Sequence, residues 1–110
     1  LRNSSAASDV YKRQLILRVI DFFDDSITDL KISISSVRRI IRDYQIVCDN
    51  YVEAIKTAPL KKIEAIDVGR RSIHDEGAGM LLESFKEKVE IDMDTARRLF
   101  TLVSIISIKI

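Results

Sequence analysis

The chain has few of the residues that interrupt regular secondary structure. Its 110 residues include three Gly, one Pro and no Trp. An all-β domain needs a turn about every 8–12 residues, and those turns usually carry Gly or Pro. The composition therefore argues against an all-β fold, and the length excludes a large doubly wound sheet or an α/β barrel. We expect one helical domain.

The sequence also lacks features of secreted and membrane proteins. Cys48 is its only cysteine, so no disulfide can form within the chain, which favours a reducing, cytoplasmic location. The apolar run near the end is broken by Lys109 and is shorter than the roughly 20 residues that a membrane span requires. We therefore expect no membrane span.

Positive and negative charges are nearly balanced in the chain. The chain has 18 Lys and Arg against 17 Asp and Glu, a formal net charge of +1 at pH 7. Residues 1–14 hold three of the basic residues and one of the acidic residues, so the charge without them is −1. A protein that binds nucleic acid through bulk charge is strongly basic. Nucleic acid is therefore an unlikely partner.

The first 14 residues differ in character from the rest. Residues 4–14, SSAASDVYKRQ, resemble the translation of a transposon adapter that is used in sequencing libraries. No Met precedes Met80. We interpret residues 1–14 as a non-native scar or a disordered tail, and residues 15–110 as a single helical-bundle domain that is truncated at its N-terminus.

The strongest periodic signal predicts a long helix from Ser26 to Lys56. Apolar residues alternate by three and four over this segment, which is a heptad pattern typical of bundles and coiled coils. Residues 15–23, LILRVIDFF, have helical spacing too and predict the end of a preceding helix. The heptad residues are Ile27, Leu30, Ile34, Val37, Ile41, Tyr44, Cys48, Tyr51 and Ile55.

One strong stop signal divides the remaining sequence. Pro59 disfavours helix at Ala58 and suits the first turn of a new helix, so it predicts a tight reversal. A second long helix is expected over 60–89, interrupted by glycines that indicate a kink or the close approach of a neighbouring backbone. A last helix should follow a cap at Asp92 or Asp94.

These elements predict an all-α fold, an antiparallel bundle of three to four helices in which two long helices form a hairpin. The long heptad stripe and the final helix carry more apolar surface than three helices can cover. We therefore expect a protein partner or a homo-oligomer.

A candidate metal site lies beside the glycines, at His74, Asp75 and Glu76. Successive helical residues point about 100° apart, so the three cannot all bind one ion. His74 or Asp75 could instead join Asp92 or Asp94 from elsewhere in the fold. A divalent metal is the one cofactor that the sequence suggests, and a solvated polar face is the alternative interpretation.

Arginines recur in adjacent pairs on each long segment. The planar guanidinium binds phosphate with two hydrogen bonds, so a cluster of these side chains could form an anion site. Nearby acidic residues could equally pair with them on a solvated face. The candidate anion-binding residues are Arg38, Arg42, Arg70, Arg71, Arg97 and Arg98.

The segment KKIEAIDVGRRSIHDEGAGMLLESFKEKVEIDMDTARRLFTLVSII resembles PhoU-like phosphate-uptake regulators over about residues 15–110. Shared features are a long helix, a tight turn, an acidic stretch, an "LLESF" stretch and a new helix that opens with Asp. That family's acidic stretch is a metal motif with a second acid. Here Asp75 and Glu76 are followed by Gly77, Ala78 and Gly79, so the second acid is missing.

Two functional hypotheses follow. The first is a non-enzymatic helical-bundle interaction or regulatory module, with the resemblance implying phosphate-uptake regulation. The alternative is a small helical enzyme that binds a metal or phosphate ligand through Asp75, Glu76 and the arginine pairs. Binding of a divalent ion that is lost in Asp75→Asn and Glu76→Gln variants would favour the second.

Overall fold

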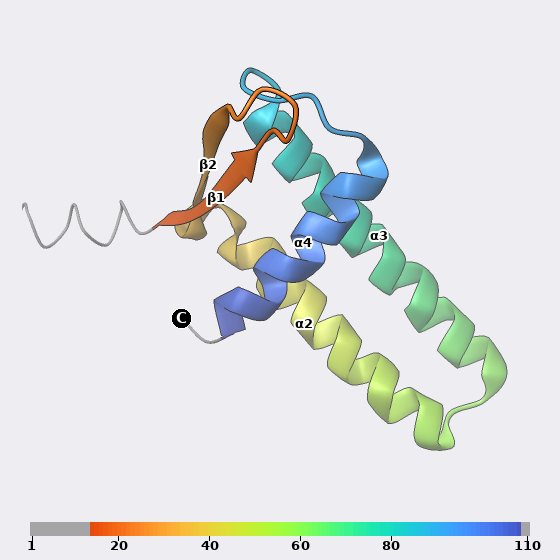
Figure 1. The fold of residues 1–110 in the computed structure, drawn as a ribbon. Helices are drawn as coiled ribbons and strands as arrows, with labels where there is room; N and C mark the ends of the chain where they lie inside the picture. The colour runs from red at the N-terminus through yellow and green to blue at the C-terminus, as the bar shows by residue number, and fades with distance from the viewer. Residues whose placement is uncertain (1–13, 109–110) are drawn as a thin grey trace, which may run out of the picture.

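A computed structural model describes residues 14–108 of the chain, two strands followed by three helices (Figure 1). Most of the segment interpreted as a scar or tail lies outside this range, so that interpretation stays a prediction. None of the helices in residues 14–108 combines the length and apolar character that a membrane crossing requires. The elements are β1 (Gln14–Ile20), β2 (Ile27–Ser33), α2 (Ile34–Thr57), α3 (Leu60–Phe85) and α4 (Met93–Ile108).

The β-hairpin makes the fold α+β, so the predicted all-α bundle is wrong. Strands β1 and β2 pair antiparallel, with Arg18 opposite Asp29 and an Nε–Oδ1 distance of 2.9 Å across the strands. Leu15 and Leu17 are partly buried and pack against the hydrophobic core. The helix expected over residues 15–23 is instead a strand, because these two leucines alternate with outward-facing residues at period two.

Three aspartates shape the turn between the strands. The Asp21 carboxylate accepts a hydrogen bond from the Phe23 N–H, and the Asp24 carboxylate accepts one from the Ser26 N–H, both at 2.8 Å. Asp25 has a φ of 57°, a left-handed conformation that Asp tolerates better than most residues. These bonds order the turn without Gly or Pro, so its only sequence signal is the run of Asp and Ser residues, which indicates a possible break but not a β-turn.

The helix predicted from Ser26 to Lys56 is wrong before Ile34. Leu30 and Ile32 are buried on one face of β2, and Lys31 between them is exposed. That is strand periodicity, but Leu30 and Ile34 are also four residues apart and so satisfy the heptad pattern. Both a strand and a helix therefore fit the local pattern, and packing against the helices favours the strand.

The predicted helical hairpin is present. Helix α2 ends at Thr57, Ala58 and Pro59 are extended, and α3 begins at Leu60 and runs back beside α2 (Figure 1). The heptad stripe is buried from Ile34 to Ile41 and becomes exposed at Ile55. The stripe does not form a coiled coil, because α4 crosses the hairpin at an angle and covers only the half near the strands (Figure 1).

Helix α4 completes the core by seating an aromatic ring on α3. The Phe100 side chain is fully buried, and a Cβ added to Gly77 would overlap its ring. Gly77 therefore permits a close approach by a side chain, whereas the sequence predicted a kink or a neighbouring backbone. The cluster consists of Leu30, Ile32, Val37, Ile40, Ile41, Ala78, Leu81, Phe85, Ala96, Phe100 and Val103.

Asp92 caps α4, as expected from the sequence. Its carboxylate accepts a hydrogen bond from the Thr95 N–H at 2.8 Å, which satisfies one of the unpaired donors of the first turn. The buried face of α4 holds Ala96, Phe100 and Val103, whereas Leu102 is largely exposed.

Replacing Gly77 with Ala should destabilise the protein by about 1–3 kcal/mol, because the new methyl group must displace the Phe100 ring. The Gly79→Ala variant is a matched control on the same helix, where nothing lies within 4 Å of the added Cβ. It should gain about 0.5–1 kcal/mol from helix propensity. Urea unfolding measures both changes, and equal effects of the two variants would contradict the contact.

Candidate functional site

Most of the sequence-predicted site residues meet in a hollow where the three helices face one another. The hollow has a volume of about 380 Å³. Helix α3 supplies four of its side chains, α4 supplies two, and α2 supplies one. The lining residues are Tyr44, Arg70, Arg71, His74, Asp75, Arg97 and Thr101.

His74 lies at the floor of this hollow in a cluster of three rings. Its centroid is 5.2 Å from that of Tyr44 and 5.2 Å from that of Phe100, and all three ring pairs are edge-to-face. Such pairs are favourable beyond the area that they bury. The histidine is therefore part of the packing between α2, α3 and α4.

The hydrogen bonds around His74 make its Nε2 a donor. Its Nε2 lies 2.7 Å from the Thr101 Oγ1, and the Thr101 hydroxyl donates to the Arg97 carbonyl at 3.2 Å. With its only proton used there, Thr101 accepts from the Nε2–H of His74. Burial lowers the pKa of His74; the nearby Asp75 raises it, and Arg70 and Arg97 lower it further.

Arg97 joins α4 to α3 through two carboxylates. Its Nε donates to Asp75 at 2.8 Å and its Nη1 donates to Asp94 at 2.7 Å. The hydrogen bond from Arg97 holds the pKa of Asp75 below its usual value. Asp94 is also in the first turn of α4, where a negative charge is favourable to the helix dipole.

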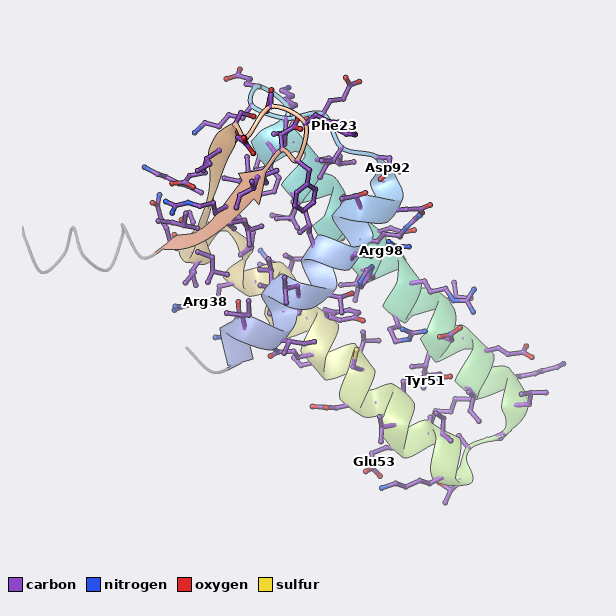
Figure 2. All side chains as sticks on the ribbon, in the orientation of Figure 1. Phe23, Arg38, Tyr51, Glu53, Asp92 and Arg98 are labelled. Atoms are coloured by element: carbon purple, nitrogen blue, oxygen red, sulfur yellow. The ribbon has the colours of Figure 1, made fainter. Side chains whose placement is uncertain are left out.

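Arg70 and Arg71 both bind one carboxylate on their own helix. Asp67 accepts hydrogen bonds from both guanidinium groups, and these bonds lower its pKa, with that from Arg70 the largest cause. Arg70 also lies over the ring of Tyr51, 5.1 Å from its centroid, where Tyr51 faces α3 (Figure 2). Burial raises the pKa of the Tyr44 hydroxyl, and Arg70 partly offsets that change.

The three predicted metal ligands do not converge. Asp75 is held by Arg97, His74 by Thr101, and Glu76 is exposed outside the hollow. In the part of the chain that the structure describes, no group of three or more His, Cys, Asp or Glu side chains is arranged to hold a metal ion.

The six candidate anion-binding arginines fall into separate places. Arg70, Arg71 and Arg97 share the hollow described above. Arg38 and Arg42 line a different hollow on α2, and Arg98 is exposed on α4, far from Arg38 (Figure 2).

Sequence reasoning missed two residues of the hollow, Thr101 and Tyr44. Tyr44 was assigned to the heptad core, which is correct for its ring but does not account for its hydroxyl. Thr101 follows Arg97 by one helical turn, so the two side chains lie on one face of α4. That spacing is the signal that could have included Thr101 in the site.

Stability should fall between pH 7.5 and pH 5.5, because the pKa of His74 is lowered in the folded protein and the unfolded chain takes up the proton first. His74 is the only histidine, and the pKa values of Asp67 and Asp75 are also lowered, which places their effect at more acidic pH. A His74→Gln variant should show a flatter profile in urea unfolding. A flat wild-type profile over this range would contradict the lowered pKa of the half-buried His74 ring.

Comparison with known proteins assigns the chain to a family. The model of the uncharacterised protein family UPF0262 matches residues 7–109. A UPF0262 protein of Rhodopseudomonas palustris (strain BisB5) is 57% identical over 75 residues, which is 68% of this chain and 46% of the relative. The corresponding protein of Nitrobacter hamburgensis is 55% identical over 75 residues, again 68% of this chain and 46% of the relative. The chain thus spans about half the length of these curated relatives.

No solved structure matches the chain. The family match overturns the resemblance to PhoU-like regulators, which depended on helical spacing and an acidic stretch that many helical hairpins share. The match extends over nearly the whole sequence, from residue 7 to residue 109. The chain belongs to the UPF0262 family.

Proposed function

We propose that this chain is a non-enzymatic protein-interaction module that docks through the turn of its β-hairpin, either on a partner protein or on a second copy. The observation that carries the proposal is the exposure of two adjacent aromatic residues. Phe22 is 93% exposed and Phe23 is 99% exposed. Scattered apolar residues are common on protein surfaces, but two fully exposed neighbouring rings are not.

The turn presents these rings in a defined shape. The carboxylates of Asp21 and Asp24 hold its backbone through hydrogen bonds, and the Asp21 N–H donates to the Ser26 carbonyl at 2.9 Å. Burying a Phe ring removes 150–250 Å² from water. A preordered turn loses little conformational entropy on binding, so more of this gain remains as affinity.

The charge around the rings restricts the partner. Asp21, Asp24 and Asp25 surround Phe22 and Phe23 with negative charge. Complementary surfaces combine an apolar contact area with charge of the opposite sign at the rim. The partner should therefore offer an apolar hollow with Lys or Arg at its edge.

The apolar surface continues from the turn onto the nearest part of the outer face of the β-hairpin. Ile20 and Ile27 are opposite each other there and more than half exposed, and the Arg18–Asp29 ion pair separates them from the exposed Ile16. A two-stranded sheet is marginal by itself and gains stability when its open face or edge is covered. This surface supports docking of the turn together with the adjoining ends of the two strands.

The enzymatic alternative has less support. It uses Asp75, Glu76 and the arginine pairs, but Asp75 is bound to Arg97, and Arg70 and Arg71 are bound to Asp67. These paired groups offer little charge to a substrate in the hollow around His74. Arg38 and Arg42 lie in a separate hollow and do not join them.

Self-association is the interaction that the chain can show without a known partner. Sedimentation velocity over a range of protein concentrations should reveal a dimer or larger species. A Phe22→Ser/Phe23→Ser variant should weaken association at least tenfold, because losing about 1.4 kcal/mol of binding energy already has that effect.

An Ile46→Ser variant is the control, because Ile46 is 53% exposed on α2 and lies outside the β-hairpin. It should leave association unchanged. A chain that is monomeric at all concentrations, or equal weakening by both variants, would contradict docking through the turn in a homo-oligomer. The same substitution can be made at the matching turn of a full-length relative. If its association is unchanged by serine there, the proposal as a whole is contradicted.

A further inference from the structure

The described arginines divide into those with acidic partners and those without. Four of them form ion pairs within the chain, with Asp29, Asp67, Asp75 or Asp94; these are Arg18, Arg70, Arg71 and Arg97. The first part of α2 differs, because Arg38, Arg39 and Arg42 have no ion-pair partner among residues 14–108.

Two of these arginines line a hollow of about 250 Å³ between α2 and the end of α4. Arg38 and Arg42 are one helical turn apart and so lie on the same face of α2. Ile34 and Ile41 supply an apolar wall, and Gln45 extends the polar edge by another turn. Arg39 does not line the hollow.

The position along α2 adds to the positive charge of this hollow. The helix begins at Ile34 and has no acidic residue in its first turn. The N-terminal end of a helix carries a partial positive charge, which favours anions and disfavours cations. Two like charges at i and i+4 also repel each other. A bound anion would relieve both effects.

A buried hydroxyl in the same hollow lacks a partner. The Ser107 side chain lines the hollow, and its Oγ is buried without a hydrogen bond to any described residue. Other hydroxyls on α4 behave differently, since Thr101 and Ser104 donate to carbonyls one turn earlier. A buried hydroxyl without a partner is unfavourable, and rotation of the Ser107 side chain toward an anion in the hollow would give it one.

We propose that this hollow binds the oxyanion group of a small ligand, a phosphate or a carboxylate. Arg38 and Arg42 provide the charged donors, and the Ser107 hydroxyl and the Gln45 amide provide neutral ones. Ile34 and Ile41 contact the apolar part of the ligand. The volume suits a compact oxyanion with a short hydrocarbon portion.

The hollow is better suited to an anion than the one around His74. There, Asp67, Asp75 and Asp94 already neutralise Arg70, Arg71 and Arg97. In the α2 hollow no described acidic side chain lines the wall. The difference lies in the pairing of the arginines and not in their number.

Thermal unfolding of the chain with inorganic phosphate, butyl phosphate or hexanoate tests the proposal, with chloride holding the ionic strength constant. A ligand that binds only the folded state raises the midpoint in a saturable manner. The two alkyl ligands separate phosphate from carboxylate recognition. Butyl phosphate should act at lower concentration than inorganic phosphate if the isoleucine wall contributes.

An Arg38→Gln/Arg42→Gln variant should need at least tenfold more ligand for half of the effect. The matched control is Arg39→Gln/Arg98→Gln, which removes the same charge from exposed arginines outside the hollow and should bind as the wild type does. A Ser107→Ala variant should bind several-fold more weakly. Far-UV circular dichroism verifies that each variant is folded.

Three results would overturn the proposal: no saturable shift with any ligand, an unchanged shift in the Arg38→Gln/Arg42→Gln variant, or equal losses in that variant and its control. The carboxylates of a second copy's turn are another source of oxyanions. In that case the protein would be stabilised only at high protein concentration, added ligand would not bind, and an Asp24→Asn/Asp25→Asn variant would lose the stabilisation. This result would assign the hollow to the turn of a second copy and contradict a small ligand.

Discussion

The seating of the Phe100 ring on Gly77 is the contact on which the rest of the described structure depends. It brings α4 close to α3, and α4 then covers the half of the helical hairpin that also supports the strands (Figure 1). The same ring contacts His74 and Tyr44. Formation of the site and burial of the core are therefore one event, because closely packed interiors leave little room for independent adjustment.

The helical hairpin and the capped last helix could be predicted because their signals are local. Pro59 fixes the reversal, and Asp92 caps α4 within its own turn. The strands could not be predicted in this way, because Leu30 and Ile34 fit both a heptad pattern and part of a two-residue alternation. Burial of Ile32 decides in favour of the strand. That burial requires α2 and α3 to be in place, which no local pattern specifies.

The site was predicted in its residue types but not in its pairing. The sequence left open whether the arginines cluster around an anion or pair with nearby acids. Adjacent residues on a helix diverge, and Arg97 lines the hollow whereas Arg98 does not. Arg70 and Arg71 instead meet at Asp67, three and four residues away. The bond from Arg97 to Asp75 joins two helices and depends on the packing of Phe100. Which arginines are left without an acid is therefore a tertiary property, and it separates the α2 hollow from the one around His74.

The most direct measurement of this account is a set of nuclear Overhauser effects from the Phe100 ring protons in solution. The account predicts contacts to the Gly77 α-protons and to the rings of His74 and Tyr44. A Phe100 ring without these contacts, or with contacts only within α4, would contradict the central packing and the site that is built on it.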